Sequence, residues 1–329
     1  MENPTTSEPK RMSLNPTPSV VFFGTPEFAV ASLEALFEAG ISIKAVVTAP
    51  DKPSGRGQKM QAPEVKVKAL EMGLEVVQPT ALKDPDFLHR LEDWDASIFV
   101  VVAFRMLPRE VWSLPRLGTF NLHASLLPDY RGAAPIHHAL LNGDEETGVS
   151  TFLIDDRIDT GSLLLQATEP IAAEDTIQTL YDRLKTRGAQ LVVQTVMELA
   201  EGQLHPQPQQ LRGTERPAPK IGREDAHLRF TDTAQQCHNR VRAFAPQPGA
   251  WFALGAPDGT VQRIKVLESR WVETDENPLD AWSIEKGIWR IRCAQGAFFP
   301  LRVQPEGRKT MDIESFINGY RPDPLSRLL

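Results

Sequence analysis

The chain has 329 residues, of which 41% are hydrophobic and 24% are charged, and its formal net charge at pH 7 is −7. This length predicts two domains, each large enough to bury a core. The acidic balance argues against nucleic-acid binding as a property of the whole surface. The acidity is uneven, because residues 1–220 carry about −8 whereas residues 221–329 carry about +1.

Three features of the sequence predict a cytoplasmic protein that is not associated with a membrane. Residues 1–18 are polar and rich in proline, without the apolar stretch of a signal peptide, and we expect a disordered tail. The longest apolar run, residues 98–104, has the length of a strand, far short of the roughly 18 residues of a membrane span. The two cysteines, Cys237 and Cys293, make no disulfide framework and are expected to be free thiols.

Strand and helix patterns alternate over residues 19–204. The run ASIFVVVA at 96–103 is apolar and β-branched, which is typical of a central strand buried on both faces. This alternation predicts an α/β domain with a mainly parallel, doubly wound sheet. Further strands are predicted at 19–23, 43–48, 74–77, 119–123, 149–154 and 162–167, and helices at 28–38, 65–72, 84–91, 135–141 and 177–200.

The pattern changes near residue 205. Four prolines and few apolar side chains predict a linker over residues 205–220. In the remaining domain, 221–329, Thr233 is expected to cap a helix that runs to Phe244. Several short strands then predict a small β-barrel. They are expected at 251–254, 261–267, 287–293 and 297–303, followed by a helix at 310–318.

Two polar residues end one strand of the first domain. Asn121 and His123 are two positions apart, so both side chains point to one face of the strand. Ligands of doubly wound sheets bind at the carboxyl ends of the strands. The plainer alternative is a capped strand with a histidine satisfied in the core. A dinucleotide site is disfavoured, because GTPEFA at 24–29 lacks the second and third glycines of that fingerprint.

Two loops could complete a site around this strand end. SLLPDYRGAAP at 125–135 contains two prolines and a glycine that predict a rigid loop. The acidic turn DDRIDTG at 155–161 is a poor calcium loop, because position 157 is an arginine, and no metal is expected. The turn could simply be solvated. We instead expect Asp159 to pair with His123, because a nearby carboxylate favours the protonated imidazole, which can stabilise an oxyanion.

Together these stretches resemble the folate-dependent formyltransferase family. NLHASLLPDYRGAAP at 121–135 is followed by GDEETGVS at 143–150 and then by DDRIDTG. FGTPEFA, PDKPSGRGQK at 50–59 and RGAAPI resemble the members that formylate methionine on initiator tRNA. The resemblance runs from residue 19 to the end and is densest before residue 165. It implies a Rossmann-like catalytic domain joined to an OB-like C-terminal barrel that binds tRNA.

The resemblance also implies the reaction and its residues. The formyl donor would be 10-formyltetrahydrofolate, used as a co-substrate without a metal, and the acceptor would be initiator methionyl-tRNA. The catalytic residues would be Asn121, His123 and Asp159, and the folate-binding residues would be Ser125, Leu126, Leu127 and Pro128. We expect the protein to act as a monomer.

A basic loop suggests where the tRNA backbone binds. Residues 50–68 hold five cations in an otherwise acidic domain, and two glycines make the loop mobile. Such a loop suits a phosphate backbone, although a solvated surface loop is the plainer alternative. Its predicted tRNA-binding residues are Lys52, Arg56 and Lys59, with Lys66 and Lys68 further along. Arg290, Arg292 and Arg302 are candidates for a basic face on the barrel.

Three other functions compete with this one. A sugar-nucleotide formyltransferase would keep the three catalytic residues but would need neither the basic loop nor the barrel. A glycinamide-ribonucleotide formyltransferase or a formyl-folate hydrolase would lack the second domain. A non-catalytic RNA- or folate-binding relative belongs to a different class, and the presence of all three catalytic residues argues against it.

Overall fold

The structure is a computed structural model that describes residues 18–54, 59–274, 280–320 and 322–329. The predicted tail therefore lies outside the described residues except for Pro18, and so does Arg56 of the basic loop. None of the helices in the described part of the chain is both long and apolar enough to cross a membrane. Cys237 and Cys293 are both buried free thiols, as predicted.

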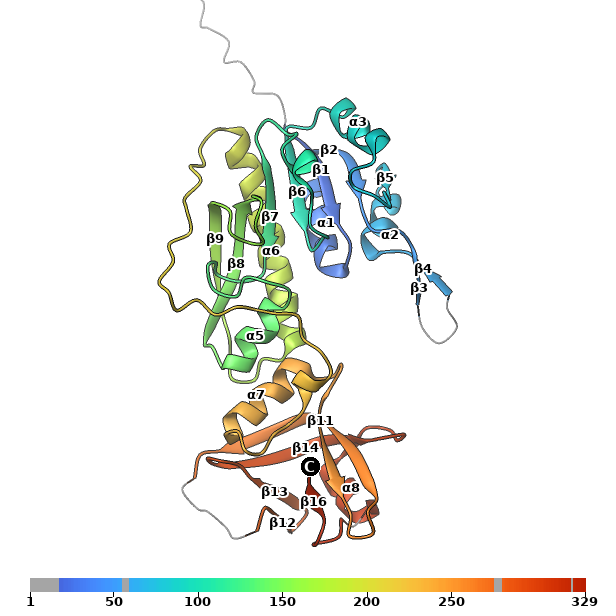
Figure 1. The fold of residues 1–329 in the computed structure, drawn as a ribbon, viewed down its shortest axis with the longest axis vertical. Coiled ribbons are helices and arrows are strands. Elements are labelled where there is room, and N and C mark those ends of the chain that lie inside the picture. The colour runs from blue at the N-terminus through green and yellow to red at the C-terminus, as the bar shows by residue number, and fades with distance from the viewer. Residues whose placement is uncertain (1–17, 55–58, 275–279, 321) are drawn as a thin grey trace, which may run out of the picture. The chain divides into compact units, whose positions relative to one another are not determined.

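The first sheet has seven strands in the order β5-β2-β1-β6-β7-β8-β9 (Figure 1). β1 pairs in parallel with β2 and β6, and β8 pairs antiparallel with β9. The predicted mainly parallel α/β sheet is thus confirmed, although β5 is only two residues long. The strands are β1 Ser19–Gly24, β2 Ser42–Val47, β5 Val76–Val77, β6 Ile98–Val102, β7 Thr119–His123, β8 Glu146–Leu153 and β9 Leu163–Pro170.

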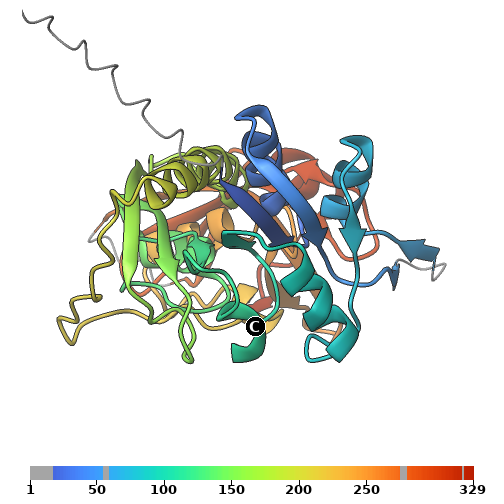
Figure 2. The same cartoon turned by 90° about the horizontal axis from the view of Figure 1, so that it is seen from above.

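Helices lie on both faces of the part of this sheet formed by β5, β2, β1 and β6, with α1 and α2 on one face and α3 and α4 on the other (Figure 2). β6 is buried along its whole length, as its continuous apolar run predicted. The helices are α1 Glu27–Glu38, α2 Glu64–Glu71, α3 Pro85–Asp93, α4 Arg109–Trp112, α5 Pro135–Asn142 and α6 Ile177–Ala200.

The flanks of the basic loop form a two-stranded antiparallel hairpin. Its strands are β3 Lys52–Ser54 and β4 Lys59–Gln61. The mobility that the sequence predicted for this loop concerns Gly55 and Gly57, which lie outside the described residues, so it stays a prediction.

The C-terminal sheet is antiparallel and curled, with the strand order β12-β13-β14-β11-β10-β16 and β15 paired with β14. This arrangement confirms the predicted OB-like fold. Aromatic side chains fill its core, where Trp289 stacks on Phe316 and contacts Phe252 edge-on. The strands are β10 Ala250–Gly255, β11 Val261–Val272, β12 Trp282–Glu285, β13 Ile288–Arg292, β14 Ala297–Pro305, β15 Met311–Asp312 and β16 Arg327–Leu328.

Two helices and a 3-10 turn accompany this sheet. Helix α7 Ala234–Phe244 begins where predicted, because Thr233 and Gln236 form a capping box. The 3-10 turn spans Glu224–Ala226. The last helix was predicted at 310–318, but α8 spans Ile313–Tyr320, because the residues just before it pair with β14 as strand β15.

By its internal contacts the chain divides into two compact units. The first unit runs to Asn121 and includes Val192–Pro206, and the second comprises Leu122–Leu191 with Gln207–Leu329. The segment between α6 and α7 has no regular helix or strand before the 3-10 turn (Figure 1). Its residues from Gln207 onward belong to the second unit, together with the loop after β7 and the acidic turn.

Candidate active site

Strand β7 carries the predicted amide and imidazole at its end. Asn121 is half-buried, and its side-chain amide has no hydrogen-bond partner among the described residues. His123 is 7% exposed, and its Nε2 lies 2.8 Å from the backbone carbonyl oxygen of Tyr130. Because a carbonyl only accepts hydrogen bonds, Nε2 must carry the hydrogen. Nδ1 is therefore the ring nitrogen that can gain or lose a proton.

The structure brings Asp159 to this ring. Its Oδ2 lies 3.8 Å from Nδ1 of His123, and the two side chains are 13% and 7% exposed. The same oxygen accepts a hydrogen bond of 2.9 Å from the backbone N–H of Gly132. Asp155 stabilises the turn itself, because its carboxylate accepts hydrogen bonds from the Arg157 N–H and the Thr160 hydroxyl. Asp159 is thus the carboxylate of the turn that faces the imidazole.

The predicted folate-binding loop alternates between buried and partly exposed residues. Ser125 and Leu127 are buried, whereas Leu126 and Pro128 are half-exposed. The backbone of the loop is held by β8, because the Ser150 hydroxyl donates to the carbonyl of Ser125 at 2.6 Å and accepts from the N–H of Leu127 at 3.1 Å. Leu126 and Pro128 are therefore the two side chains of this loop free to contact a ligand.

Tyr130, whose carbonyl orients His123, is itself tightly held. Its hydroxyl donates to Asp144 at 2.7 Å. Arg216 donates two bonds of 2.7 Å to the same carboxylate, and its guanidinium lies 4.7 Å from the centre of the Tyr130 ring. Burial first, and then the Asp144 carboxylate, raise the pKa of the Tyr130 phenol, which keeps it neutral. This network holds Tyr130 in place, and the carbonyl of Tyr130 in turn orients the imidazole of His123.

Sequence reasoning missed three groups that shape this site. They are the carbonyl of Tyr130, the N–H of Gly132, and the side-chain amide of Gln209, which donates to the carbonyl of Asp159 at 2.9 Å. The first two are backbone groups, which side-chain patterns do not reveal. Gln209 lies in the predicted linker, one of several glutamines in a proline-rich stretch, and nothing in its spacing distinguishes it.

The cations of the basic loop differ in whether a carboxylate of the protein already pairs with them. Lys52 is exposed on β3, whereas Lys59 is placed on β4 with its side chain outside the described part of the structure. Lys66 pairs with Asp51 at 2.8 Å. Lys68 pairs with Glu34 at 3.0 Å and with Glu71 at 3.2 Å. Two of the five cations thus already have carboxylate partners.

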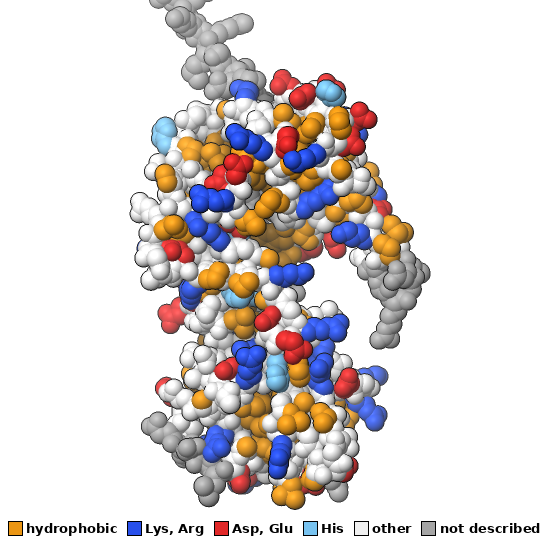
Figure 3. All heavy atoms as spheres, viewed as in Figure 1, with side chains coloured by type: hydrophobic (Ala, Val, Ile, Leu, Met, Phe, Trp, Pro, Cys, Tyr) orange, Lys and Arg blue, Asp and Glu red, His pale blue; other side chains and the backbone are white. Residues whose placement is uncertain are grey.

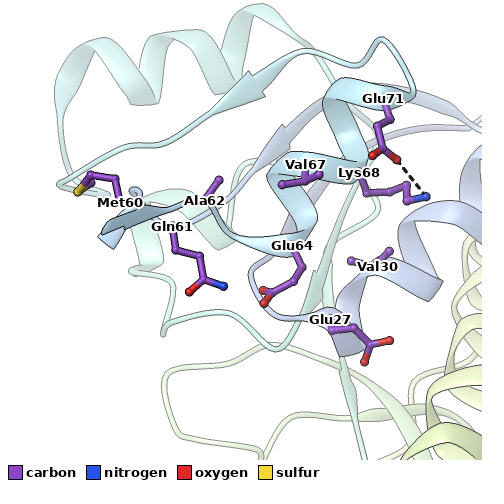
Figure 4. A pocket seen from close by; sticks show the side chains of 9 residues that line it. All are labelled: Glu27, Val30, Met60, Gln61, Ala62, Glu64, Val67, Lys68 and Glu71. Carbon is purple, nitrogen blue, oxygen red and sulfur yellow. Dashed lines mark ion pairs between the residues drawn. The ribbon is translucent and has the colours of Figure 1, made fainter. Parts of the chain in front are cut away.

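A cavity of about 560 Å³ opens beside the hairpin, between α1, β4 and α2 (Figure 4). Its walls carry three carboxylates, Glu27, Glu64 and Glu71, against the single paired cation Lys68. Met60 and Val67 add exposed apolar surface. Negative charge of this kind repels phosphate, so the cavity is not where a nucleic-acid backbone would bind.

The C-terminal sheet presents a second basic region. Trp251 on β10 is stacked on His227 at 4.3 Å, and the guanidinium of Arg263 on β11 lies 4.0 Å from its ring centre. Lys265 pairs directly with Trp251 across the two strands and so shares its face. Figure 3 shows Lys and Arg side chains gathered on part of this sheet. By contrast, Arg302 is paired with Glu268 at 2.7 Å.

The fold and the site define a class of protein, and the sequence places the chain in it. Residues 18–196 match the formyl transferase family, and residues 220–321 match the formyl transferase C-terminal domain. The chain therefore belongs to the formyl transferase family. The methionyl-tRNA formyltransferase of Bacteroides fragilis is 40% identical over 306 residues, which cover 92% of this chain and 94% of that protein. The methionyl-tRNA formyltransferase of Porphyromonas gingivalis is 43% identical over 309 residues, covering 92% and 95%.

Solved structures share the fold at lower identity. An N-formyltransferase from Helicobacter canadensis, in complex with folinic acid and dTDP-3-aminofucose, has a TM-score of 0.63 at 19% identity and covers 86% of this chain and 99% of that one. HypX from Aquifex aeolicus in complex with tetrahydrofolic acid has a TM-score of 0.55 at 16% identity and covers 91% and 47%. At these identities the likeness concerns the fold alone.

Proposed function

We propose that this chain transfers the formyl group of 10-formyltetrahydrofolate to the amino group of initiator methionyl-tRNA, which yields formylmethionyl-tRNA for translation initiation. The observation that carries the proposal is the nearly buried pair of His123 and Asp159, 3.8 Å apart, with Asn121 two positions earlier on the same strand. The choice of acceptor is supported by relatives about 40% identical over 92% of the chain.

The reaction replaces one carbon–nitrogen bond by another. The amine attacks the formyl carbon, the carbonyl oxygen becomes an oxyanion, and the bond to N10 of the folate then breaks. The amine loses one proton, and the folate nitrogen gains one. The Asn121 amide, which has no partner among the described residues, would donate a hydrogen bond to the formyl oxygen. One such donor is typically worth about 3–4 kcal/mol of barrier.

His123 would supply the positive charge opposite the oxyanion. Its Nε2–H is held by the carbonyl of Tyr130, so a second proton must sit on Nδ1. That nitrogen faces the Asp159 carboxylate, whose Oδ2 lies 3.8 Å away. With a proton on each nitrogen, the imidazole would stabilise negative charge that develops beside it.

Asp159 would orient the imidazole and accept the amine proton. Its Oδ2 is held by the N–H of Gly132, whereas Oδ1 has no hydrogen-bond partner in the described part of the chain. A carboxylate held by one oxygen and open at the other suits a positioned general base, a role typically worth about 10²–10⁴-fold in rate. The donor would be held by the loop of Ser125 to Pro128, with Leu126 and Pro128 as its exposed contacts.

The tRNA would be held by both domains, which we place at 19–204 and 221–329 with a linker at 205–220. In the first, Lys52, Arg56 and Lys59 would meet the phosphate backbone. In the second, the support comes from Arg263, which is exposed yet held against Trp251. A protein with these substrates would act in the cytoplasm, and we propose that it does so as a monomer.

Purified protein incubated with 10-formyltetrahydrofolate and charged initiator tRNA tests the proposal, because the product is read directly as formylmethionyl-tRNA. We expect turnover, and we expect Asp159→Asn to lower kcat by at least 100-fold with unchanged folding. An amino-sugar nucleotide serves as the control acceptor. Turnover with the sugar and none with the tRNA would replace the proposed acceptor, and full activity of the variant would remove Asp159 from the chemistry.

A further inference from the structure

The segment after α6, which the sequence predicted as a spacer, is hydrogen-bonded to the loops of the candidate site. Gln207 exchanges two backbone hydrogen bonds with Leu163, at 2.8 and 2.9 Å. The N–H of Tyr130 donates to the carbonyl of Arg216 at 2.6 Å, and the N–H of Ala218 donates to the carbonyl of Arg131 at 2.8 Å. One end of residues 207–218 is therefore bonded to β9 and the other end to the loop that follows β7.

Gln209 uses its whole side-chain amide in this contact. Its Oε1 accepts two hydrogen bonds from the Arg131 guanidinium, at 3.1 and 2.6 Å. Its Nε2 donates to the backbone carbonyls of Asp159 and Gly161, each at 2.9 Å. Gln209 is half-buried, whereas the adjacent Gln210 is exposed. One side chain thus bridges the loop after β7 and the acidic turn.

These two segments meet at the carboxylate that faces the imidazole. Asp159 has a left-handed backbone with φ of +54°, a region that aspartate enters more readily than most residues other than glycine, and the bonds to its carbonyl and carboxylate hold it there. Its carboxylate rests on the N–H of Gly132, the residue next to Arg131. The Gln209 amide therefore bonds to the backbone of Asp159 and also to Arg131, whose neighbour Gly132 holds the Asp159 carboxylate.

We propose that Gln209 is a positioning residue for the reaction, which keeps the Asp159 carboxylate at its place beside Nδ1 of His123. The inference rests on the proposed function. Gln209 touches neither the imidazole nor the carboxylate oxygens, so its effect passes through the backbone of Asp159. Displacement of about 1 Å at a catalytic group can lower turnover by about 100-fold without affecting substrate binding.

The test uses Gln209→Met, which keeps the length of the side chain and removes every hydrogen bond. Gln209→Glu keeps the acceptor for Arg131 but cannot donate to the two carbonyls. Gln210→Ala is the matched control on the exposed neighbour. We expect both Gln209 variants to lower kcat by about 10- to 100-fold, with the KM values for the folate donor and for methionyl-tRNA within twofold of wild type, and the control to be unchanged.

A double variant separates positioning from general damage. If Gln209 acts through Asp159, then Gln209→Met should cost little further activity in the Asp159→Asn background, because the group it positions has already lost its function. The inference would be overturned if the kcat losses of the two single variants multiplied in the double variant. A change mainly in KM would overturn it as well.

The ring of His123 gives a readout that does not depend on the substrate. Its nitrogen resonances, assigned with His123→Ala, report the position of the carboxylate beside Nδ1, and their chemical shifts at fixed pH should change in Gln209→Met but not in Gln210→Ala. Unchanged shifts would overturn the role of Gln209 even if the wild type formylates methionyl-tRNA. An inactive wild type with altered shifts in the variant would overturn the proposed function alone.

Discussion

Replacing Gly132 by alanine should damage both stability and turnover, for reasons that the structure allows to be separated. Gly132 has φ of +126°, a backbone conformation in which a side chain costs about 1–3 kcal/mol. A Cβ at this position would also collide with the carbonyl of Ala218, so the linker would have to move.

Two hydrogen bonds join the linker to the loop at this point. The N–H of Ala134 donates to the carbonyl of Ala218 at 3.2 Å, and the N–H of Ala218 donates to the carbonyl of Arg131 at 2.8 Å. Their loss at about 1 kcal/mol each adds to the backbone strain. We therefore expect Gly132→Ala to lower the free energy of unfolding by about 3–5 kcal/mol. Because the N–H of Gly132 also holds Asp159, kcat should fall at least tenfold as well.

Gly213→Ala is the matched control for this variant. Gly213 lies in the same linker with φ of +80°, but a Cβ there would meet no atom within 4 Å. The strain of a left-handed alanine should lower the free energy of unfolding of Gly213→Ala by only about 1–2 kcal/mol. The kcat of this variant should be unchanged. Urea unfolding and the formylation assay measure both quantities. Equal stability losses in the two variants, or unchanged kcat in Gly132→Ala, would refute the claim that the linker packs against this loop.

Three further predictions concern acid stability, a buried carboxylate and tRNA binding. Burial lowers the pKa of His137 and of His238 to about 4. Below about pH 6.5 the unfolded chain therefore binds more protons than the folded chain does. The free energy of unfolding should fall as the pH drops from 6.5 towards 4. Each histidine should lower the free energy of unfolding by at most about 2 kcal/mol at pH 5. Urea unfolding should show that His238→Gln loses less of this free energy between pH 7.5 and pH 5 than the wild type does. Asp175 is buried, and its carboxylate accepts bonds of 2.6 and 2.8 Å from the Arg183 guanidinium, which also pairs with Glu169 at 2.7 Å. Asp175→Ala should therefore lower the free energy of unfolding by about 2 kcal/mol, the cost of losing bonds to a charged group, and an unchanged urea midpoint would contradict this. Arg263→Ala should weaken tRNA binding and reduce the slope of log K against log salt by about one, whereas a variant that removes the exposed cation of Lys44 on β2 should leave that slope unchanged.

Most of the fold was predictable because its signals are local. The strand at 119–123 and the helix at 177–200 have the predicted bounds, and the cap at Thr233 starts α7 where its side chain predicted. These features depend on residues within a few positions of one another. The last helix was misplaced for the opposite reason, since residues 311–312 are drawn into β15 by pairing with Arg302 and Val303 on another strand.

The candidate site was predictable in its side chains but not in its supports. Asn121 and His123 follow from the two-residue period of a strand. The approach of Asp159 was expected from charge chemistry, and the 3.8 Å separation agrees with it. The role of Gln209 could not be predicted, because its partner Arg131 lies 78 positions away and the contact exists only once the segment after α6 lies on the loop.

The way the linker is bonded has a consequence for dissecting the molecule. A gene truncated after residue 206 would encode every proposed catalytic side chain, yet it would leave the N–H of Tyr130 and the carbonyl of Arg131 without the partners that Arg216 and Ala218 now provide. We therefore expect the shortest active form of this chain to extend to at least residue 218.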